Sequence, residues 1–345
     1  AIAGFTCAPL NPGYAEAELQ RLLAGMNVAC MMTLAGANDQ ALHLARKMGI
    51  EAIELEGGAG KFVVKGAGRV LEEGNVWTGA DDTVLLLHTS GTTARPKLVG
   101  LTNKNVAHSV SAIKDWLGIT PRDRCLNMMP LFHVHGQISV FASLAAGGSA
   151  VCAPGFDPER FTDWLGGFQP TWYSAVPAIH RAAIDIVQRN PPSAAKWRLR
   201  FIRSASSPLP VRLLRGLEEA FKVPVVEAYG MTEASHGITS NPLPPRARKP
   251  GSVGLPYPGQ EVAVIGEGGR SMGEGEVGEI IIRGANVITG YLENPEANAK
   301  SFWQGWLRTG DLGCMDSEGY LYIRGRAKEL INKGAINFNN NKWNF

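Results

Sequence analysis

The chain has 345 residues, 45% of them hydrophobic, which is enough to bury one large core or the cores of two domains. Its formal net charge of +3 is too small to indicate a nucleic-acid or membrane-surface partner, so we expect basic character only locally, at a phosphate site. The five cysteines form no CxxC pair, which argues against a structural zinc or a disulfide framework and favours a reducing compartment such as the cytoplasm. No apolar run approaches the ~20 residues that span a bilayer.

The first 80 residues alternate between helical and strand-like patterns and read as part of an α/β subdomain. Two segments have helical periodicity and two are short apolar runs typical of strands. In chain order these segments are Glu16–Ala24, Val28–Thr33, Gln40–Met48 and Ala52–Leu55. The Gly-rich stretches Gly57–Gly68 and Gly74–Asp82 are predicted to be loops.

The next stretch, VLLLHTSGTTARPK, combines a buried strand with a polar loop. The large apolar residues Val84–Leu87 predict a strand buried on both faces, as in a parallel sheet. The hydroxyl-rich residues Thr89–Thr93 follow, and Lys97 ends the loop, which supplies the donors and the cation that could hold a polyphosphate. A Walker A loop does not fit, because Pro96 and Leu98 occupy two of its defining positions. An ordinary Ser/Thr-rich turn remains open at this point.

From Val84 to about residue 245, strand-like runs alternate with helices at short spacing. Helices are predicted at Asn103–Trp116 (capped by Thr102 or Asn103), Gly136–Ala146, Asp157–Phe168, Pro177–Gln188 and Pro210–Phe221. Strands are predicted at Val84–His88, Cys125–Met129, Ala150–Ala153, Trp172–Ala175, Phe201–Arg203 and Val223–Ala228. This pattern predicts a mostly parallel sheet covered by helices, with ligands at the carboxyl ends of the strands. The polar motifs at Thr89, His133, Ser204 and Tyr229 follow such strands.

Beyond Asn241 the chain becomes Pro/Gly-rich, and a small β-rich subdomain is expected. Its predicted strands are Glu261–Ile265, Glu279–Arg283 and Tyr320–Ile323. The Asn-rich end differs in composition from the rest. We therefore divide the chain into a first α/β subdomain (1–80), a second α/β subdomain (81–245), a β-rich subdomain (250–325) and a terminal segment (326–345). The family resemblance described next implies that the first is a remnant of a subdomain and that the last is a hinge region with an atypical tail.

The motif TSGTTARPK resembles the phosphate loop of the ANL superfamily, which comprises acyl-CoA synthetases, adenylation domains of peptide synthetases and luciferases. Further motifs occur in the family's order: LFHVHG, EAYGMTEA, GEVGEIIIRG, WLRTGDL and YIRGRAKELI. The pairing of LFHVHG with TEASH and SNPLP is most similar to the oxalate–CoA ligases. The resemblance implies parallel sheets flanked by helices, plus a small β-rich subdomain. It also implies activation of a carboxylic acid by ATP and Mg²⁺ as an acyl-adenylate, followed by transfer to CoA.

The resemblance implies which residues bind the nucleotide and which bind the metal ion. The implied ATP- or AMP-binding residues are Thr89, Ser90, Gly91, Thr92, Thr93, Ser207, Glu227, Ala228, Tyr229, Thr232, Asp311 and Arg326. The implied catalytic residues are Lys97, His133, Thr232 and Glu233, with Glu233 as the Mg²⁺ ligand and Lys328 as the hinge. From the residues alone, Glu233 could equally be a solvated loop carboxylate and Asp311 a turn aspartate.

For the acyl substrate, the resemblance assigns His133, His135, Ser206 and His236. On sequence alone His133 reads as a packed core histidine. Polar groups at these positions would be poorly matched to a long alkyl chain, so a short dicarboxylate is favoured, oxalate first and malonate second. Three alternatives stay open: a ligase for an aromatic or fatty acid, a non-catalytic nucleotide-binding module and, more remotely, a P-loop phosphotransferase.

The resemblance also bears on the ends of the chain. It implies a preceding segment of the large domain and, after Gly334, a mobile C-terminal domain carrying a second lysine. Without that domain we expect binding of ATP or acyl-adenylate but slow or absent formation of acyl-CoA. A peroxisomal address is conceivable for a longer chain, although this one does not end in Ser-Lys-Leu.

Overall fold

The computed structural model divides the chain into two compact units, Leu10–Trp77 and a larger unit made of Ala1–Pro9 with Thr78–Phe345. The residues that it describes are 4–58, 61–65, 78–89, 97–189, 197–327, 330–333 and 336–339.

The smaller unit is a three-stranded sheet with two helices. Its elements are α1 (Glu16–Ala24), β1 (Cys30–Leu34), α2 (Asp39–Lys47), β2 (Glu51–Gly58) and β3 (Lys61–Lys65). Strand β1 pairs with β2 in parallel, and β3 pairs with β2 antiparallel. The prediction of a loop over Gly57–Gly68 is therefore wrong at its start. The segment KFVVK has the aromatic and β-branched residues that favour a strand, and this outweighs the flanking glycines.

The centre of the larger unit is a seven-stranded sheet in the order β12-β11-β10-β9-β8-β6-β7. The strands are β6 (Arg124–Asn127), β7 (Ser149–Cys152), β8 (Trp172–Ala175), β9 (Phe201–Ser204), β10 (Val225–Tyr229), β11 (Thr239–Ser240) and β12 (Leu255–Pro256). Strands β10, β9, β8, β6 and β7 run parallel, whereas β11 and β12 extend the sheet antiparallel. The predicted parallel sheet flanked by helices is confirmed.

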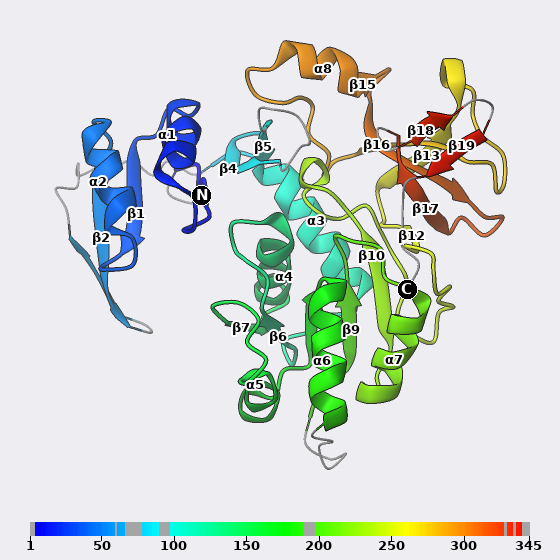
Figure 1. Cartoon of the computed structure of the whole chain (residues 1–345), viewed down its shortest axis with the longest axis horizontal. Helices are drawn as coiled ribbons and strands as arrows, with labels where there is room; N and C mark the ends of the chain where they lie inside the picture. Colours follow the sequence, from blue (N-terminus) through cyan, green and yellow to red (C-terminus); the bar gives the residue numbers. More distant parts are fainter. Residues whose placement is uncertain are drawn as a thin grey trace. The chain divides into compact units, whose positions relative to one another are not determined.

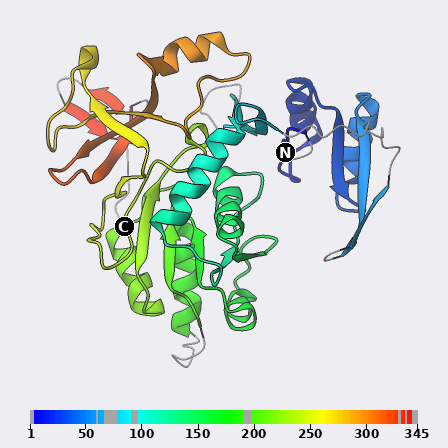
Figure 2. The same ribbon diagram turned by 180° about the vertical axis from the view of Figure 1, so that it is seen from behind.

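Helices cover both faces of this sheet. On one face Tyr173 and Ile202 pack against α5 (Phe161–Phe168), α6 (Pro177–Arg189) and α7 (Val211–Phe221). On the other face Trp172 and Phe201 pack against α3 (Asn103–Trp116) and α4 (Val134–Ala145). Successive strand residues thus enter opposite cores, which explains the continuous apolar runs in the sequence. Helix α6 lies in front of the sheet in Figure 1, and α3 lies in front of it in Figure 2.

Two helix starts show the effect of local capping. Helix α3 begins where predicted, with Thr102 and Asn105 bonded reciprocally as a capping box. Helix α5 begins at Phe161, later than the predicted Asp157. The Asp157 carboxylate accepts a bond from the Glu159 amide at 2.9 Å, so it forms a turn before the helix and does not cap it.

Strand β4 (Thr83–His88) does not belong to the parallel sheet. It pairs antiparallel with β5 (Leu98–Thr102) in a separate two-stranded sheet, and Cys7 forms a parallel bridge to Leu85. The prediction of a parallel environment for Val84–His88 is therefore wrong. An apolar run reports burial on both faces but not strand direction, and here a cluster that includes Val134, Ile288 and Tyr291 provides the burial.

The β-rich part of the larger unit is an antiparallel sheet in the order β13-β14-β16-β15, with β17 also paired to β16. Its strands are β13 (Gln260–Ile265), β14 (Gly278–Gly284), β15 (Phe302–Trp303), β16 (Trp306–Met315) and β17 (Leu321–Arg326). The short helices are η1 (Thr232–Ala234), η2 (Glu267–Gly269) and α8 (Pro295–Ser301), and β18 (Leu330–Lys333) pairs antiparallel with β19 (Ile336–Asn339). Asp311 lies within β16, so it is not a turn residue.

Candidate active site

The predicted phosphate loop is described only at its two ends. The residues Ser90, Gly91, Thr92 and Thr93 lie outside the described part of the chain, as does the predicted hinge Lys328. At the ends of the loop, the Thr89 amide donates to the Lys97 carbonyl oxygen at 3.0 Å, next to the β4–β5 pair. The structure therefore brings the first hydroxyl residue and the closing lysine of the motif together.

Lys97 and Glu233 are connected through Tyr291, a residue that the sequence did not single out. The Lys97 ammonium lies 4.2 Å from the centroid of the Tyr291 ring, a cation–π contact. The Tyr291 hydroxyl donates to Glu233 Oε1 at 2.8 Å. Burial, together with the Glu233 carboxylate, raises the pKa of Tyr291, so this hydroxyl stays protonated as the donor. The predicted phosphate cation and the predicted metal ligand thus share one oriented aromatic ring.

Glu233 is a nearly buried carboxylate, 7% exposed, in the short helix η1 that begins at Thr232. Its carbonyl oxygen accepts a bond from the Ile288 amide at 2.9 Å, which fixes the backbone. Among the described residues no group of three or more His, Cys, Asp or Glu side chains could hold a metal. A single carboxylate nevertheless fits Mg²⁺, which uses one or two carboxylates and completes its shell with phosphate and water oxygens.

Tyr229, Asp311 and Arg326 form a chain of contacts between the seven-stranded sheet and the β-rich sheet of the larger unit. The Tyr229 hydroxyl donates to Asp311 Oδ2 at 2.5 Å. The second oxygen of Asp311 lies 3.0 Å from the Arg326 Nε, and the two residues are register partners on β16 and β17. Burial and the nearby Asp311 carboxylate raise the pKa of Tyr229, which keeps it a donor. Asp311 is thus held in place as an oriented acceptor.

Glu227, on β10, fixes the loop that follows β9. One carboxylate oxygen accepts the Leu209 amide at 2.9 Å, while Oε2 is buried without a partner. Burial raises the pKa of Glu227 to about 7. The next residue, Ala228, is buried, and Ser207, within the loop that Glu227 tethers, is exposed.

The segment that follows Tyr229 has an unusual backbone that its neighbours hold in place. Ser235 and His236 both have positive φ, at 48° and 77°. The Asn286 side chain donates to the carbonyl oxygens of Ala234 at 3.1 Å and Gly237 at 2.6 Å. A Cβ at Gly230 would lie 1.3 Å from the His236 oxygen, so only glycine fits there. We call Thr232–Gly237 the switchback loop.

The predicted acyl-site residues His135, Ser206 and His236 come together in the structure. The rings of His135 and His236 are stacked, with centroids 4.7 Å apart. His135 Nδ1 lies 3.0 Å from Ser206 Oγ. Both imidazoles are buried, and this burial, aided by the positive charge of Arg203, lowers their pKa values well below the usual range. They are therefore neutral near pH 7.

His133 does not join this cluster. It is an exposed residue that precedes α4, and its ring lies 4.7 Å from the Phe132 ring. Partial burial still lowers the pKa of its imidazole.

Arg203 and Ser174 complete the histidine cluster, and sequence reasoning missed both. Arg203 Nη1 lies 3.0 Å from His236 Nε2 and 3.2 Å from Ser174 Oγ, and Ser174 Oγ lies 2.6 Å from His135 Nε2. The sequence did contain an indication for Arg203. The segment FIR was predicted to be a strand, and an arginine within a strand is rarely buried unless it has a partner. Ser174 and Tyr291 carried no comparable signal.

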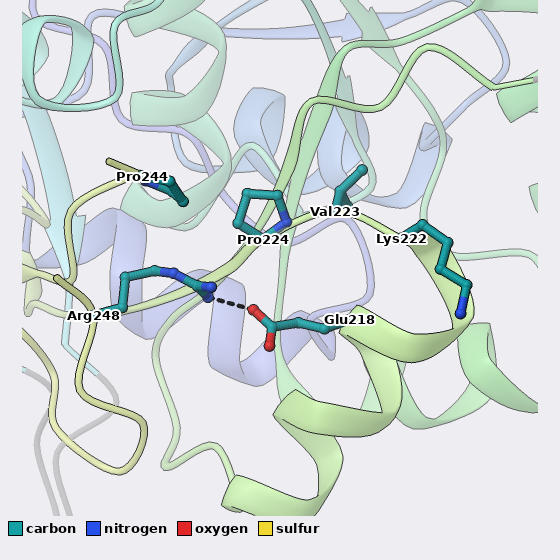
Figure 3. Close-up of a pocket in the computed structure, with 6 residues that line it drawn as sticks. All are labelled: Glu218, Lys222, Val223, Pro224, Pro244 and Arg248. Atoms are coloured by element: carbon teal, nitrogen blue, oxygen red, sulfur yellow. Dashed lines mark hydrogen bonds and ion pairs between the residues drawn. The ribbon is translucent and has the colours of Figure 1, made fainter. Parts of the chain in front are cut away.

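Figure 3 shows a pocket on the larger unit. It is lined by Glu218, Lys222, Val223, Pro224, Pro244 and Arg248. Arg248 bonds to Glu218 and to the Val225 carbonyl oxygen, and Glu218 accepts the Val225 amide. These polar groups fix the start of β10, and the pocket contains none of the predicted site residues.

Comparison with known proteins identifies the family of this chain. The family described as AMP-binding enzyme matches residues 1–292. An oxalate–CoA ligase of Arabidopsis thaliana is 42% identical over 339 residues, which are 96% of this chain and 66% of that protein. A sulfoacetate–CoA ligase of Cupriavidus necator is 40% identical over 259 residues, 74% of this chain and 50% of its own length. The solved O-succinylbenzoate coenzyme A synthetase of Bacillus subtilis, in complex with ATP and magnesium ion, aligns with a TM-score of 0.82 at 28% identity, covering 96% of this chain and 66% of that one.

The chain therefore belongs to the family of AMP-binding enzymes. It spans 66% of the length of the oxalate–CoA ligase that it matches. Within the described ranges, no helix has both the length and the apolar character needed to cross a membrane.

Proposed function

We propose that this chain binds ATP and a short dicarboxylic acid, and that the protein to which it belongs activates the acid as an acyl-adenylate and transfers the acyl group to CoA. The observation that carries the proposal is the switchback loop. It holds Glu233 beside Lys97 and Tyr291 on one side, and it stacks His236 on His135 on the other. A site for a metal-bound triphosphate and a polar acyl site thus meet on one short segment.

The proposed chemistry has two balanced steps. In the first, a carboxylate oxygen of the acid bonds to the α-phosphorus of ATP, and the bond to the bridging oxygen breaks so that pyrophosphate leaves with the electron pair. In the second, the CoA sulfur bonds to the acyl carbon, AMP leaves, and the thiol proton passes to solvent. The first step brings two anions together, and the second requires the sulfur and the acyl carbon to be aligned, so positioning and charge neutralisation are the main requirements.

The described residues fit these requirements. Thr89 and Lys97 flank the phosphate loop, and Thr232 with Glu233 lies opposite Tyr291. Glu233 would hold Mg²⁺, which neutralises phosphate charge when bound. Asp311 would accept bonds from the ribose hydroxyls, with Tyr229 and Arg326 holding its orientation. His133 would lie beside the reacting carboxylate, where an imidazole N–H can donate a hydrogen bond to it.

Two observations support a short dicarboxylate as the acid. The buried cluster of His135, His236 and Arg203 is polar and carries a positive charge, so a long alkyl chain would leave these groups without partners. The related proteins are named for oxalate and sulfoacetate, both of which carry two acidic groups. We propose oxalate first and malonate second.

The test is a hydroxylamine-trapping assay of acyl-adenylate formation with ATP and Mg²⁺. Oxalate, malonate, coumarate and octanoate are offered separately, and the hydroxamate and pyrophosphate are both measured. We expect products with oxalate or malonate and none without ATP. A protein that forms hydroxamate only with coumarate or octanoate would contradict the substrate proposal. A protein that forms none with any acid would contradict the activity.

A further inference from the structure

Arg203 is a buried cation without a counter-charge. It is 1% exposed, and no ion pair joins it to a carboxylate in the part of the chain that the structure describes. One of its nitrogens contacts Ser174 and His236, whereas Nε and Nη2 are buried with no hydrogen-bond partner. An arginine does not lose its proton in a protein, so burial leaves a full positive charge desolvated. We therefore expect a bound ligand with a negative charge to compensate the positive charge of Arg203.

A continuous series of hydrogen bonds connects Arg203 to Ser206. Arg203 Nη1 can only donate, so His236 Nε2 and Ser174 Oγ accept from it. Ser174 Oγ lies 2.6 Å from His135 Nε2, and His135 Nδ1 lies 3.0 Å from Ser206 Oγ. Two arrangements satisfy these contacts: either Ser174 donates to Nε2 and Nδ1–H donates to Ser206, or Nε2–H donates to Ser174 and Ser206 donates to Nδ1. A bound carboxylate that accepts from Ser206 favours the first arrangement, in which the Ser206 hydroxyl proton points to the ligand.

This chain of bonds leads from the core toward the proposed acyl site. Arg203, Ser174 and His135 are buried, but Ser206 is exposed and has a positive φ of 71°. A serine at positive φ has a strained backbone, and such strained residues are often found at ligand-binding positions. In the arrangement in which Ser206 donates to a ligand, each donor is polarised by the one before it, starting from the Arg203 charge, and this strengthens the Ser206 hydroxyl as a donor.

We propose that Arg203 is the positioning residue that makes the acyl site selective for acids with a second negative charge. It acts by supplying an uncompensated positive charge behind His135 and His236, and, in the hydrogen-bond arrangement that a bound second carboxylate favours, by supporting Ser206 as a donor to that carboxylate. This inference rests on the proposed function, since it names the determinant of the acid that the same site takes.

The experiment compares acids of equal shape but different charge. Oxamate replaces one carboxylate of oxalate by an amide, so the oxalate-to-oxamate ratio of kcat/KM for hydroxamate formation reports the second charge alone. For the wild-type protein we expect a preference for oxalate of about tenfold or more. In Arg203→Met we expect the oxalate value to fall about tenfold while the oxamate value changes little, so that the ratio approaches one. Arg203→Lys, which retains the charge, should recover part of the preference.

The matched control is Arg215→Met, which removes the same net charge from an exposed position on α7. It should leave the ratio at the wild-type value. A purely structural role for Arg203 would lower both kcat/KM values equally and leave the ratio unchanged, and this result would overturn the proposal. If Arg203→Met fails to fold, Ser206→Ala takes its place, because its side chain is exposed. An unchanged ratio in that variant would overturn the proposal equally.

Binding measurements distinguish a failure of this inference from a failure of the proposed function. Calorimetric titration of the same variants with oxalate and oxamate needs no turnover. If the wild-type protein forms no hydroxamate but binds oxalate more tightly than oxamate, and only while Arg203 is present, the proposed activity fails and the charge selectivity stands. If hydroxamate forms but neither rate nor affinity depends on Arg203, the activity stands and the inference fails.

Discussion

Tyr229 donates its hydroxyl proton to Asp311 over 2.5 Å, and this bond joins the parallel sheet of the larger unit to its β-rich sheet. Tyr229 ends β10 and Asp311 lies in β16, two strands that belong to different sheets. Because Arg326 lies on the other oxygen of Asp311, the carboxylate is oriented from both sides before any ligand arrives. We expect this preorganisation to contribute to nucleotide affinity as well as to stability.

Tyr229→Phe should weaken both properties. The change leaves Asp311 Oδ2 without its donor, which should cost about 1–3 kcal/mol in the free energy of unfolding and lower ATP affinity. Urea denaturation and ATP titration measure the two effects. Tyr320→Phe is the control, since that hydroxyl donates to the Ala247 carbonyl oxygen at 2.6 Å, away from the site. It should lose stability but keep ATP affinity, and an equal loss of affinity in both variants would contradict the assignment.

Glu233→Gln should abolish the dependence of ATP affinity on magnesium. The amide oxygen can still accept from Tyr291, so the fold should survive, but the negative charge that attracts Mg²⁺ is lost. We expect Mg²⁺ to strengthen ATP binding at least about tenfold in the wild-type protein and only slightly in the variant. Glu159→Gln, an exposed substitution, serves as the control and should behave as wild type. Magnesium dependence that persists in Glu233→Gln would show that the ion binds elsewhere.

Glu227→Gln should change how stability depends on pH. Burial raises the pKa of Glu227 from 4.5 to about 7, so the folded protein binds this proton more tightly than the unfolded chain. Its contribution is fully present below about pH 4.5 and is lost as pH rises through about 7, amounting to at most ~3 kcal/mol. The variant should therefore gain stability relative to wild type between about pH 5 and about pH 8.

Denaturation of both proteins at each pH measures this difference for Glu227. Burial lowers the pKa values of His135, His180 and His236, which gives the opposite slope below their ordinary pKa, but these groups are common to both proteins and cancel in the comparison. Parallel stability profiles would mean that Glu227 stays ionised in the folded protein.

Gly230→Ala and Gly166→Ala should have opposite effects. A Cβ at Gly230 would overlap the His236 carbonyl, so the substitution must displace the switchback loop and should cost about 3 kcal/mol or more. Gly166 lies inside α5 with nothing within 4 Å of an added Cβ, so alanine there should stabilise by up to about 1 kcal/mol. Thermal unfolding of the two variants gives the comparison. Equal effects would indicate that the switchback loop is not rigid.

Much of the fold could be predicted from the sequence, because in those segments the local preference for helix or strand agrees with the pattern of burial in the folded protein. The helix Asn103–Trp116 has a capping residue, helical periodicity and a buried face, and the structure has it at the predicted bounds. The prediction failed for Val84–His88, where burial was read correctly but strand direction was not, because an apolar run does not show that its partner is Leu98–Thr102, the next strand along the chain. It failed at Asp157 because that carboxylate bonds within a turn and not at a helix end.

For the candidate site, sequence motifs identified residues but not the bonds that hold them. His135, Ser206 and His236 are far apart in the chain, yet they meet in one cluster. Arg203 and Tyr291 escaped notice because their importance lies in which neighbours they contact, and this depends on strand order and register. The roles of the residues remain predictions, to be tested by the variants above.

The switchback loop has a consequence for altering this protein. Glu233 and His236 share one short, braced backbone segment, so under the proposed function exchanges within the loop would affect nucleotide and acid binding together. Arg203 and Ser174, in contrast, lie on β9 and β8, whose apolar neighbours Phe201, Ile202, Trp172 and Tyr173 pack in the cores. We therefore expect that, under the same proposal, acyl preference can be changed on these two strands without changing the nucleotide site.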